Sequence, residues 1–347
     1  LAAGMVDAFT EAGIPAFGPN RAAAQIEASK VFSKNLMKKY HIPTAAYEVF
    51  DTPEKTLAYV RKQNRYPVVI KADGLALGKG VIIAQNFDEA KDAVHTIMED
   101  KVFGNSGNQV VVEEFLTGPE VSVLAFADGK TLKPMVSSKD HKRALDGNKG
   151  KNTGGMGTIS PNPSYTDAIA DECMKTIFMP TLKAMNAEGR PFKGCLYFGL
   201  MLTPDGPKVI EYNSRFGDPE AQVVLPRLKT DLVDIFEATI NGTLDKIDIQ
   251  WKKEACACVI MASGGYPGSY KKGLEISGLD QNGQVEGAMV YHAGTLKKDG
   301  KFYTNGGRVL GVTCTGATLE EALQKSYTAV AKIHWDGVQY RHDIGHA

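Results

Sequence analysis

The residues with the clearest capacity for chemistry follow the apolar pair Val209–Ile210. Because side chains alternate along a strand, Glu211 and Asn213 should point to the same side of it. Two oxygen-bearing side chains on one face suit a hard cation such as Mg²⁺, which takes about six oxygen ligands and keeps some as water or phosphate. Arg215 and Asp218 follow in the same loop, so the stretch carries more charge than a turn requires. The alternative is an ordinary strand end whose polar side chains are solvated or cap a neighbouring helix.

A glycine-rich segment, residues 73–80, offers a second kind of chemistry. Its backbone N–H groups can surround anionic oxygens, and Lys79 adds a positive charge. It is not a Walker A loop, because the spacing from Gly74 to Gly78 is one residue short and Gly80 stands where Ser or Thr is needed. Since the segment joins two apolar runs, we expect a hairpin that closes over phosphates. The alternative is a mobile surface hairpin.

Charged side chains also lie within or directly after apolar runs. Lys71 is inside such a run, where an ammonium group is costly unless an anion pairs with it. Phosphate oxygens would provide that pairing, and the alternative is a salt bridge to a carboxylate. Residues 113–116 end another run, where the backbone can hydrogen-bond an adenine edge and Glu120 can accept from ribose hydroxyls. Carboxylates at strand ends are common, so this last feature alone is weak support.

The hydrophobic pattern predicts the elements that position these residues. Lys34, Lys38 and Lys39 are expected on the solvated face of the first long helix, while the polar segment 137–163 should be a loop, functional or disordered. Helices are expected over 22–40, 53–63, 88–99, 167–188, 230–241 and 319–333, and strands over 47–50, 66–73, 81–84, 109–116, 120–126, 131–136, 194–203, 255–262, 289–293 and 309–315.

Composition argues against several classes of partner. The 347 residues include 40 basic and 40 acidic side chains, so the net charge gives no reason to expect nucleic acid or an anionic membrane. No apolar run reaches the roughly 18 residues that a spanning helix needs, and no signal-peptide pattern is present at the start. The five cysteines lack a paired zinc motif, since Cys256 and Cys258 are spaced C-x-C, and buried reduced thiols are expected.

The ends of the sequence suggest a fragment of a longer chain. Residues 1–13 predict a helix without a capping residue, and residues 14–20 predict a short strand and a turn. A helix and a strand with nothing before them are typical of the last part of an α/β domain. The final residues, 343–347, form no obvious terminal element.

Together, a lysine-bearing strand, a glycine-rich hairpin, a strand ending in acidic residues and a distant Glu-x-Asn strand resemble the ATP-grasp enzymes. The residues narrow this resemblance to the glycinamide ribonucleotide synthetases, also called phosphoribosylamine–glycine ligases. The resemblance covers essentially the whole chain in order, and it is carried by residues 69–81, 113–116, 140–143, 152–157, 209–220 and 304–310.

This resemblance implies a fold class and a reaction. The fold is α+β and α/β: an ATP-grasp domain at 21–250, whose two α+β subdomains enclose the nucleotide and whose lid spans about 45–115. A remnant of an N-terminal Rossmann-like domain is expected at 1–20 and a small C-terminal α+β domain at 251–347. The family ligates glycine to 5-phospho-D-ribosylamine in de novo purine biosynthesis, converting ATP to ADP and phosphate through glycyl phosphate.

The same resemblance implies roles for individual residues. Glu211 and Asn213 would bind Mg²⁺ or Mn²⁺, while Arg215 would neutralise the glycine carboxylate or acyl phosphate and Asp218 would hold an amine, as the catalytic pair. The expected nucleotide contacts are Lys30, Lys71, Gly74, Gly78, Lys79 and Gly80 for the phosphates, Glu113, Glu114, Phe115 and Leu116 for the adenine, and Glu120 for the ribose. The expected substrate residues are Asp140, Lys142, Asn152, Gly154, Gly155, Arg215 and Asp218.

The expected partners are ATP, glycine and phosphoribosylamine, bound by a cytoplasmic monomer or weak dimer, with no nucleic acid and no membrane. No nucleophilic Ser or Cys is required, and His141 is expected to be a hydrogen-bond partner in its loop rather than a base. The family's N-terminal glycine-rich motif, expected to hold the ribosylamine phosphate, is not in this sequence. Two alternatives stay open: an ATP-grasp ligase with a different amine acceptor, and a nucleotide-binding protein without catalysis.

Overall fold

A computed structural model describes residues 1–75 and 80–346, which form two compact units. Unit 1 comprises residues 1–134, 166–215 and 233–247, and unit 2 comprises residues 135–165, 216–232 and those from 248 onward. Each unit therefore combines segments that are distant in the sequence. The predictions for Gly78 and Lys79 lie outside the described residues.

Unit 1 contains two antiparallel four-stranded sheets, with strand orders β1-β4-β2-β3 and β12-β11-β5-β6. Its strands are β1 (Tyr47–Phe50), β2 (Val68–Ala72), β3 (Val81–Ala84), β4 (Val110–Glu114), β5 (Glu120–Asp128), β6 (Leu132–Pro134), β11 (Lys193–Thr203) and β12 (Gly206–Asn213). Its helices are α1 (Met5–Glu11), α2 (Gln25–Ala28), α3 (Lys30–Lys39), α4 (Pro53–Gln63), α5 (Phe87–Val94), α6 (Asp167–Cys173), α7 (Met179–Ala187) and nearly all of α9 (Leu232–Asn241).

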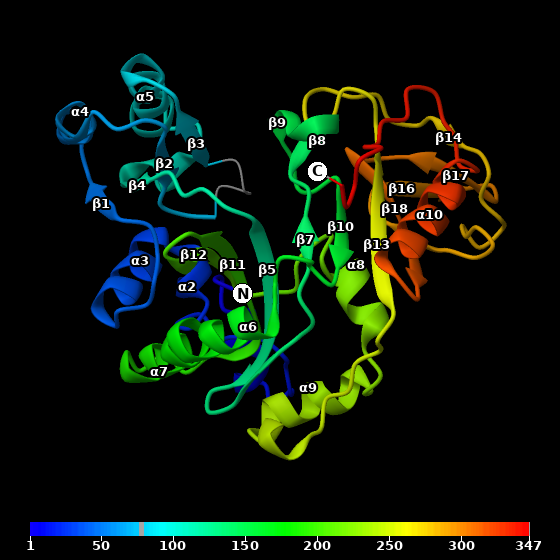
Figure 1. The fold of residues 1–347 in the computed structure, drawn as a ribbon, viewed down its shortest axis with the longest axis horizontal. Coiled ribbons are helices and arrows are strands. Elements are labelled where there is room, and N and C mark those ends of the chain that lie inside the picture. Colours follow the sequence, from blue (N-terminus) through cyan, green and yellow to red (C-terminus); the bar gives the residue numbers. More distant parts are fainter. Residues whose placement is uncertain (76–79, 347) are drawn as a thin grey trace. The chain divides into compact units, whose positions relative to one another are not determined.

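The first sheet is covered by α4 and α5 (Figure 1). Its strands are rich in β-branched residues, which pack well on a pleated surface, and Ile70 and Val112 are buried with Val60 and Val94 of the two helices. Strands β2 and β3 pair as the two arms of a hairpin. The prediction that the glycine-rich segment joins two paired strands is therefore confirmed.

The helix predicted over 22–40 is interrupted at Ser29. Ser29 has an extended backbone (φ −127°, ψ 114°), and its Oγ accepts a hydrogen bond from the N–H of Phe32 at the start of α3. The carboxylate of Asp73 accepts from the Ser29 Oγ at 3.0 Å and from the Val31 N–H at 3.1 Å. The break therefore ties the first turn of α3 to the start of the glycine-rich segment, because a cap satisfies N–H groups that a continuous helix would use internally.

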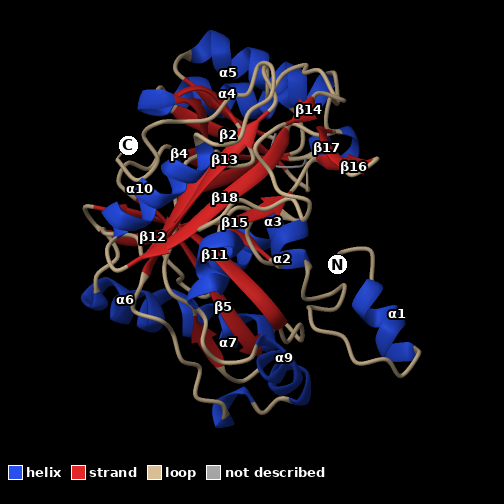
Figure 2. Ribbon diagram, turned by 90° about the vertical axis from the view of Figure 1, so that its right-hand side faces the viewer, coloured by secondary structure: helices blue, strands red, loops and turns tan. Residues whose placement is uncertain are grey.

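The first residues also differ from prediction. The helix α1 is shorter than residues 1–13 and has no buried residue, and residues 14–20 form no strand. In Figure 2, α1 lies away from both sheets of unit 1. A strand requires a hydrogen-bonded neighbouring strand, and among the described residues no strand pairs with residues 14–20. No helix in the described part of the chain is long and apolar enough to cross a membrane.

Unit 2 contains a five-stranded sheet with the order β15-β18-β13-β10-β7, a three-stranded sheet, β14-β17-β16, and the hairpin β8-β9. The strands β13 and β18 run side by side, and α10 packs on them (Figures 1 and 2). The elements are β7 (Lys139–Asp140), β8 (Arg143–Leu145), β9 (Lys149–Asn152), β10 (Gly157–Ser160), α8 (Ala221–Val224), β13 (Ala255–Ala262), β14 (Glu275–Ile276), β15 (Met289–His292), β16 (Thr295–Lys298), β17 (Lys301–Thr304), β18 (Arg308–Gly316) and α10 (Leu319–Val330).

The polar segment 137–163 is not the long loop that was predicted. It forms β7, β8, β9 and β10, and β10 pairs with β13 along residues 157–160. Within the segment β8 pairs with β9 and β7 pairs with β10, while β10 also pairs with the distant strand β13. Tertiary pairing therefore overrides the local pattern.

Candidate active site

The strand β12 carries both predicted metal ligands on one face. Glu211 lies opposite Gly199 of β11, where a Cβ atom would come within 3.2 Å of the Glu211 Cγ, so the glycine leaves room for the carboxylate side chain. Tyr212 points to the other face, where it is buried and its hydroxyl lies 2.9 Å from the Thr181 Oγ1. The alternation predicted for Glu211 and Asn213 is consistent with this packing.

A bulge lies directly before Glu211. The register of β12 against β11 shifts between Gly199 and Leu200, which leaves Ile210 as the extra residue. The Ile210 carbonyl accepts a hydrogen bond from the Lys71 Nζ at 3.2 Å. The irregular backbone of β12 thus provides an acceptor for the lysine predicted to contact phosphate.

Glu113 of β4 is shared by two buried lysines. Its Oε2 lies 2.9 Å from the Lys71 Nζ and 3.2 Å from the Lys34 Nζ, and the three side chains are 4%, 7% and 2% exposed. The Glu113 Oε1 has no hydrogen-bond partner among the described residues. Lys71 therefore forms the carboxylate salt bridge considered as the alternative, and its phosphate role stays a prediction.

The prediction that Lys34 lies on a solvated face is wrong. Burial lowers the pKa of Lys34 to about 8, against the opposing effect of the Glu113 carboxylate. A helical pattern cannot identify this lysine as buried, because its partner belongs to a strand far along the sequence. Lys38 and Lys39, by contrast, are exposed as predicted.

Lys30 is tied to the start of the glycine-rich segment. Its Nζ donates to the Gly74 carbonyl at 2.7 Å. Gly74 has φ +150°, and a Cβ there would lie 2.0 Å from the Ser106 Oγ, so a side chain cannot be accommodated without a shift. Burial lowers the pKa of Lys30, and the Glu211 carboxylate acts in the opposite direction. The Glu211 carboxylate therefore contributes to the electrostatic environment of Lys30.

The residues predicted for adenine and ribose lie at the ends of β4 and β5. The Glu114 Oε1 accepts from the Ala46 N–H at 2.9 Å and lies 3.7 Å from the Lys208 Nζ. Phe115 is 39% exposed and Glu120 is exposed at the first position of β5. A single exposed aromatic ring is ordinary on a protein surface, so the adenine and ribose roles stay predictions.

Arg215 lies beside the predicted metal ligand Asn213. Its Nη2 is 3.5 Å from the Asn213 Oδ1, and its Nε is 3.5 Å from the Glu27 Oε1. The other oxygen of Glu27 accepts from the Ser214 N–H at 2.9 Å. The Arg215 side chain as a whole is 54% exposed, so it is accessible from solvent.

In unit 2, four predicted substrate residues converge around Arg308. The Arg308 Nη1 donates to the Gly154 carbonyl at 2.7 Å and to the Asp218 carbonyl at 3.1 Å, and its Nη2 lies 2.9 Å from the Asp218 Oδ2. Gly155 has φ +111°, and a Cβ there would lie 2.5 Å from the Asp140 Oδ1. Arg308 itself was not predicted as a site residue, although it belongs to the stretch 304–310 that supports the family resemblance.

The other predicted substrate residues of unit 2 lie on the adjoining polar segment. The Lys142 carbonyl accepts two hydrogen bonds from Thr153, from its N–H and its hydroxyl, each at 2.8 Å. Asn152 pairs with Arg143 in the hairpin β8-β9 and is exposed. Lys142 thus contributes its main chain to the turn, while Asn152 presents its side chain to solvent.

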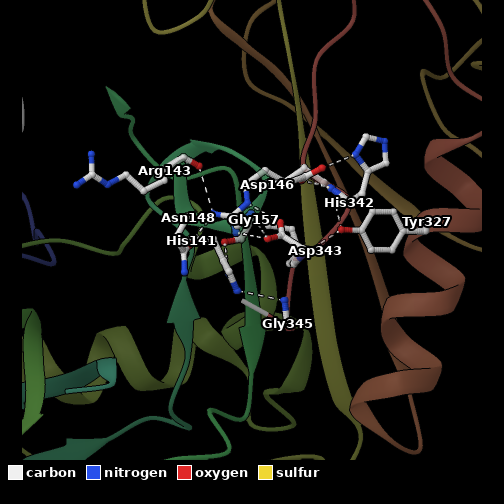
Figure 3. A network of polar contacts seen from close by, with 12 residues as sticks. His141, Arg143, Asp146, Asn148, Gly157, Tyr327, His342, Asp343 and Gly345 are labelled. Carbon is white, nitrogen blue, oxygen red and sulfur yellow. Dashed lines mark hydrogen bonds and ion pairs between the residues drawn. The ribbon is translucent and has the colours of Figure 1, made fainter. Parts of the chain in front are cut away.

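His141 is a buried hydrogen-bond partner within the network of Figure 3. Its Nδ1 lies 3.1 Å from the Gly157 carbonyl, and its Nε2 accepts from the Gly345 N–H at 3.1 Å. These contacts require a neutral ring with the proton on Nδ1. Burial lowers the pKa of His141 to about 4. Both ring nitrogens are engaged, which favours the predicted structural role over that of a base.

The C-terminal residues of Figure 3 fasten the hairpin β8-β9. Arg341 is fully buried, and its Nη1 donates to the Asn148 Oδ1 at 3.0 Å and to the Arg143 carbonyl at 3.3 Å. Asp343 pairs with Arg341 at 2.7 Å and accepts from the Gly147 N–H at 2.8 Å. These contacts order a polar segment that has little apolar surface of its own.

The side chains present suit a cation that arrives with a nucleotide. No group of three or more His, Cys, Asp or Glu side chains in the described ranges could hold a metal ion by itself. Glu211 and Asn213 provide one carboxylate and one amide oxygen. Mg²⁺ commonly binds through one or two such side chains and completes its shell with water and phosphate oxygens. The donor set therefore fits the predicted metal.

Comparison with known proteins establishes the family. The model of the phosphoribosylglycinamide synthetase ATP-grasp (A) domain matches residues 28–221, and that of the C domain matches residues 256–347. The chain belongs to the phosphoribosylglycinamide synthetase family. It is 49% identical over 347 residues to the phosphoribosylamine–glycine ligase of Vibrio parahaemolyticus, covering 100% of this chain and 80% of that protein. It is 50% identical over 347 residues to the trifunctional purine biosynthetic protein adenosine-3 of Gallus gallus, covering all of this chain and 34% of that protein.

Solved structures confirm the ATP-grasp fold of this phosphoribosylglycinamide synthetase family member. A phosphoribosylamine–glycine ligase from Thermotoga maritima matches with a TM-score of 0.85 and 38% identity, over 94% of this chain and 81% of that chain. The biotin carboxylase domain of the Hydrogenobacter thermophilus 2-oxoglutarate carboxylase matches with a TM-score of 0.72 over 96% of this chain and 72% of that chain. Its identity is only 16%, so this second likeness concerns the fold alone.

The neutral state of His141 predicts a loss of stability in acid. The unfolded chain takes up a proton near pH 6.5, whereas the folded chain does so only near pH 4. The contribution of His141 is therefore complete above pH 6.5 and is lost as the pH falls toward 4, by about 3 kcal/mol in the free energy of unfolding. Urea denaturation at several pH values should show a smaller acid-dependent loss for His141→Gln. An equal loss in both proteins would contradict the assignment.

Proposed function

We propose that the chain catalyses the ATP-dependent ligation of glycine to 5-phospho-D-ribosylamine, giving glycinamide ribonucleotide, ADP and phosphate. The observation that carries this proposal is the 49% identity to a phosphoribosylamine–glycine ligase over the whole of this chain. In the proposed route a glycine carboxylate oxygen attacks the γ-phosphorus and ADP leaves. The ribosylamine nitrogen then attacks the acyl carbon of glycyl phosphate, loses a proton and displaces phosphate.

We assign the nucleotide to residues of unit 1. Lys30, Lys71 and the segment from Gly74 to Gly80 would contact the phosphates, residues 113–116 the adenine and Glu120 the ribose. The buried Glu113 Oε1, which has no hydrogen-bond partner among the residues that the structure describes, supports the adenine assignment. Such an acceptor raises the free energy of the protein until a donor, such as an exocyclic amino group, reaches it.

We assign a divalent cation, Mg²⁺ or Mn²⁺, to Glu211 and Asn213. When bound, it would neutralise negative charge on the nucleotide phosphates. The placement of Arg215 beside Asn213 supports a role for its guanidinium in binding the glycine carboxylate or the acyl phosphate. The chain's own contribution is then to align anions that would otherwise repel one another.

We assign the amine-bearing substrate to residues of unit 2. Asp218 would hold an amine, with Asp140, Lys142, Asn152, Gly154 and Gly155 around it. No cysteine nucleophile is proposed, because all five cysteines are buried and burial raises the pKa of Cys256 and Cys258 to about 12. A thiol with such a pKa is inert at neutral pH.

The remaining assignments rest on the sequence alone. We propose an ATP-grasp domain at 21–250, followed by a C-terminal domain at 251–347. A cytoplasmic monomer or weak dimer that binds no nucleic acid is also proposed.

The reaction predicts ADP release that depends on both substrates. ADP should form only when glycine and phosphoribosylamine are present together with ATP and Mg²⁺, measured by a coupled ADP assay. Turnover with a different amine in place of phosphoribosylamine would select another ATP-grasp ligase. ATP binding without any turnover would select the non-catalytic alternative.

Removing the charge of Glu211 should abolish most turnover without unfolding the protein. Glu211→Gln keeps the shape of the side chain but removes a carboxylate ligand, so kcat should fall at least about a hundredfold while the melting temperature stays close to that of the parent. Glu54→Gln, on an exposed position of α4, serves as the control. Unchanged turnover of Glu211→Gln at limiting Mg²⁺ would rule out the metal assignment.

The contacts of Arg308 predict that its substitution changes the KM of a substrate rather than the affinity for ATP. Arg308→Met removes the contacts that hold Gly154 and Asp218, so the KM of phosphoribosylamine or glycine should rise about tenfold or more while the ATP affinity stays within about twofold. Arg308→Lys should recover only part of the loss, because lysine cannot reproduce the fork of donors. Steady-state kinetics in each substrate would contradict this role if both KM values were unchanged.

A further inference from the structure

The buried cluster of Lys34, Lys71 and Glu113 contains more positive than negative charge. Both ammonium groups share the Glu113 Oε2, at 3.2 and 2.9 Å. One lysine would suffice to compensate the carboxylate. The second cation needs an explanation, since a buried ammonium group is costly unless it is paired.

The two lysines differ in how completely the protein satisfies them. An ammonium group has three N–H donors. Those of Lys34 face the Glu113 Oε2, the Thr44 Oγ1 at 2.7 Å and the Ala45 carbonyl at 3.5 Å. Within the described ranges, Lys71 has only the Glu113 Oε2 and the Ile210 carbonyl as partners. Lys34 is therefore held in place, whereas Lys71 retains a donor for an incoming anion.

We propose that Lys34 is a positioning residue for nucleotide binding: it keeps Glu113 compensated when Lys71 turns from this carboxylate to the phosphate oxygens. The inference rests on the phosphate role proposed above for Lys71. Under this proposal Lys71 binds the ligand, whereas Lys34 remains paired with Glu113.

The physical reason is the cost of a buried unpaired carboxylate. If Lys34 were absent, Lys71 would be the only cation of the described part of the chain within hydrogen-bond distance of Glu113. Its movement to a phosphate would then leave the carboxylate without a partner, and this penalty would be subtracted from the free energy of nucleotide binding. With Lys34 in place, the movement exchanges one partner of Lys71 for another and leaves Glu113 paired.

A double-mutant cycle tests this proposal. ATP affinity is measured on the full chain by calorimetry with a non-hydrolysable ATP analogue and Mg²⁺. Lys34→Met should weaken binding about tenfold to a hundredfold and leave the KM of glycine unchanged. The control is Lys38→Met, because Lys38 is exposed on the same helix and lies 5.6 Å from the centre of the Tyr47 ring, as Lys34 does at 5.4 Å.

The second arm of the cycle separates charge compensation from a loss of folding. Glu113→Gln removes the carboxylate, so adding Lys34→Met in that background should change the ATP affinity by less than about twofold. This comparison does not require the single Lys34→Met variant to fold. A further tenfold loss in the Glu113→Gln background, or a Lys34→Met variant that binds as tightly as Lys38→Met, would overturn the proposal.

Lys71→Ala distinguishes the failure of this inference from that of the proposed phosphate contact. If Lys71→Ala leaves the ATP affinity unchanged, the phosphate role fails and the inference fails with it. If Lys71→Ala weakens binding and Lys34→Met does not, the inference fails alone. The expected result is that both variants bind more weakly and that only the effect of Lys34→Met disappears in the Glu113→Gln background.

Discussion

A buried carboxylate must be compensated, and in unit 1 this requirement joins several elements at Glu113. Lys71 lies on β2 and Lys34 on α3, and both pair with Glu113. Each lysine is also connected to β12 by hydrogen bonds, Lys71 directly and Lys34 through Thr44. Lys71 donates to the Ile210 carbonyl, while Lys34 donates to Thr44, whose hydroxyl donates to the Val209 carbonyl at 2.7 Å. The residues before Glu211 are thereby connected to the sheet that carries the glycine-rich hairpin. One electrostatic constraint, the compensation of Glu113, therefore helps to position both the candidate metal-binding strand β12 and the candidate phosphate-binding residue Lys71.

Unit 2 meets a comparable requirement with arginines. Its polar segments have few apolar side chains to bury, so their main-chain groups are satisfied by guanidinium donors instead. Arg308 links the backbone at Gly154 to Asp218, and Arg341 links the hairpin β8-β9 to Asp343. Gly155 lets the first of these segments pass close to Asp140. The loops assigned to substrate are therefore positioned by specific polar contacts.

Local pattern predicted what depends on neighbours in the sequence. The alternation of side chains along a strand predicted that Glu211 and Asn213 share a face. The apolar runs on either side of residues 73–80 predicted the hairpin β2-β3. The local pattern failed where the partner is distant in the sequence. Lys34 is predicted to be solvated because the pattern does not show its partner Glu113. Residues 137–163 are predicted to be a loop because the pattern does not show that β10 pairs with β13. Arg308 was missed for the same reason, since its partners are far along the chain. The family resemblance supplied the chemistry that no single motif specified.

The most direct test of this account is a crystal structure of the full chain with a non-hydrolysable ATP analogue and Mg²⁺. We expect to find the Lys71 Nζ within hydrogen-bond distance of a phosphate oxygen, Glu113 still paired with Lys34, and the cation bound by Glu211 and Asn213. A structure in which Lys71 remains on Glu113 while the phosphates bind elsewhere would contradict it.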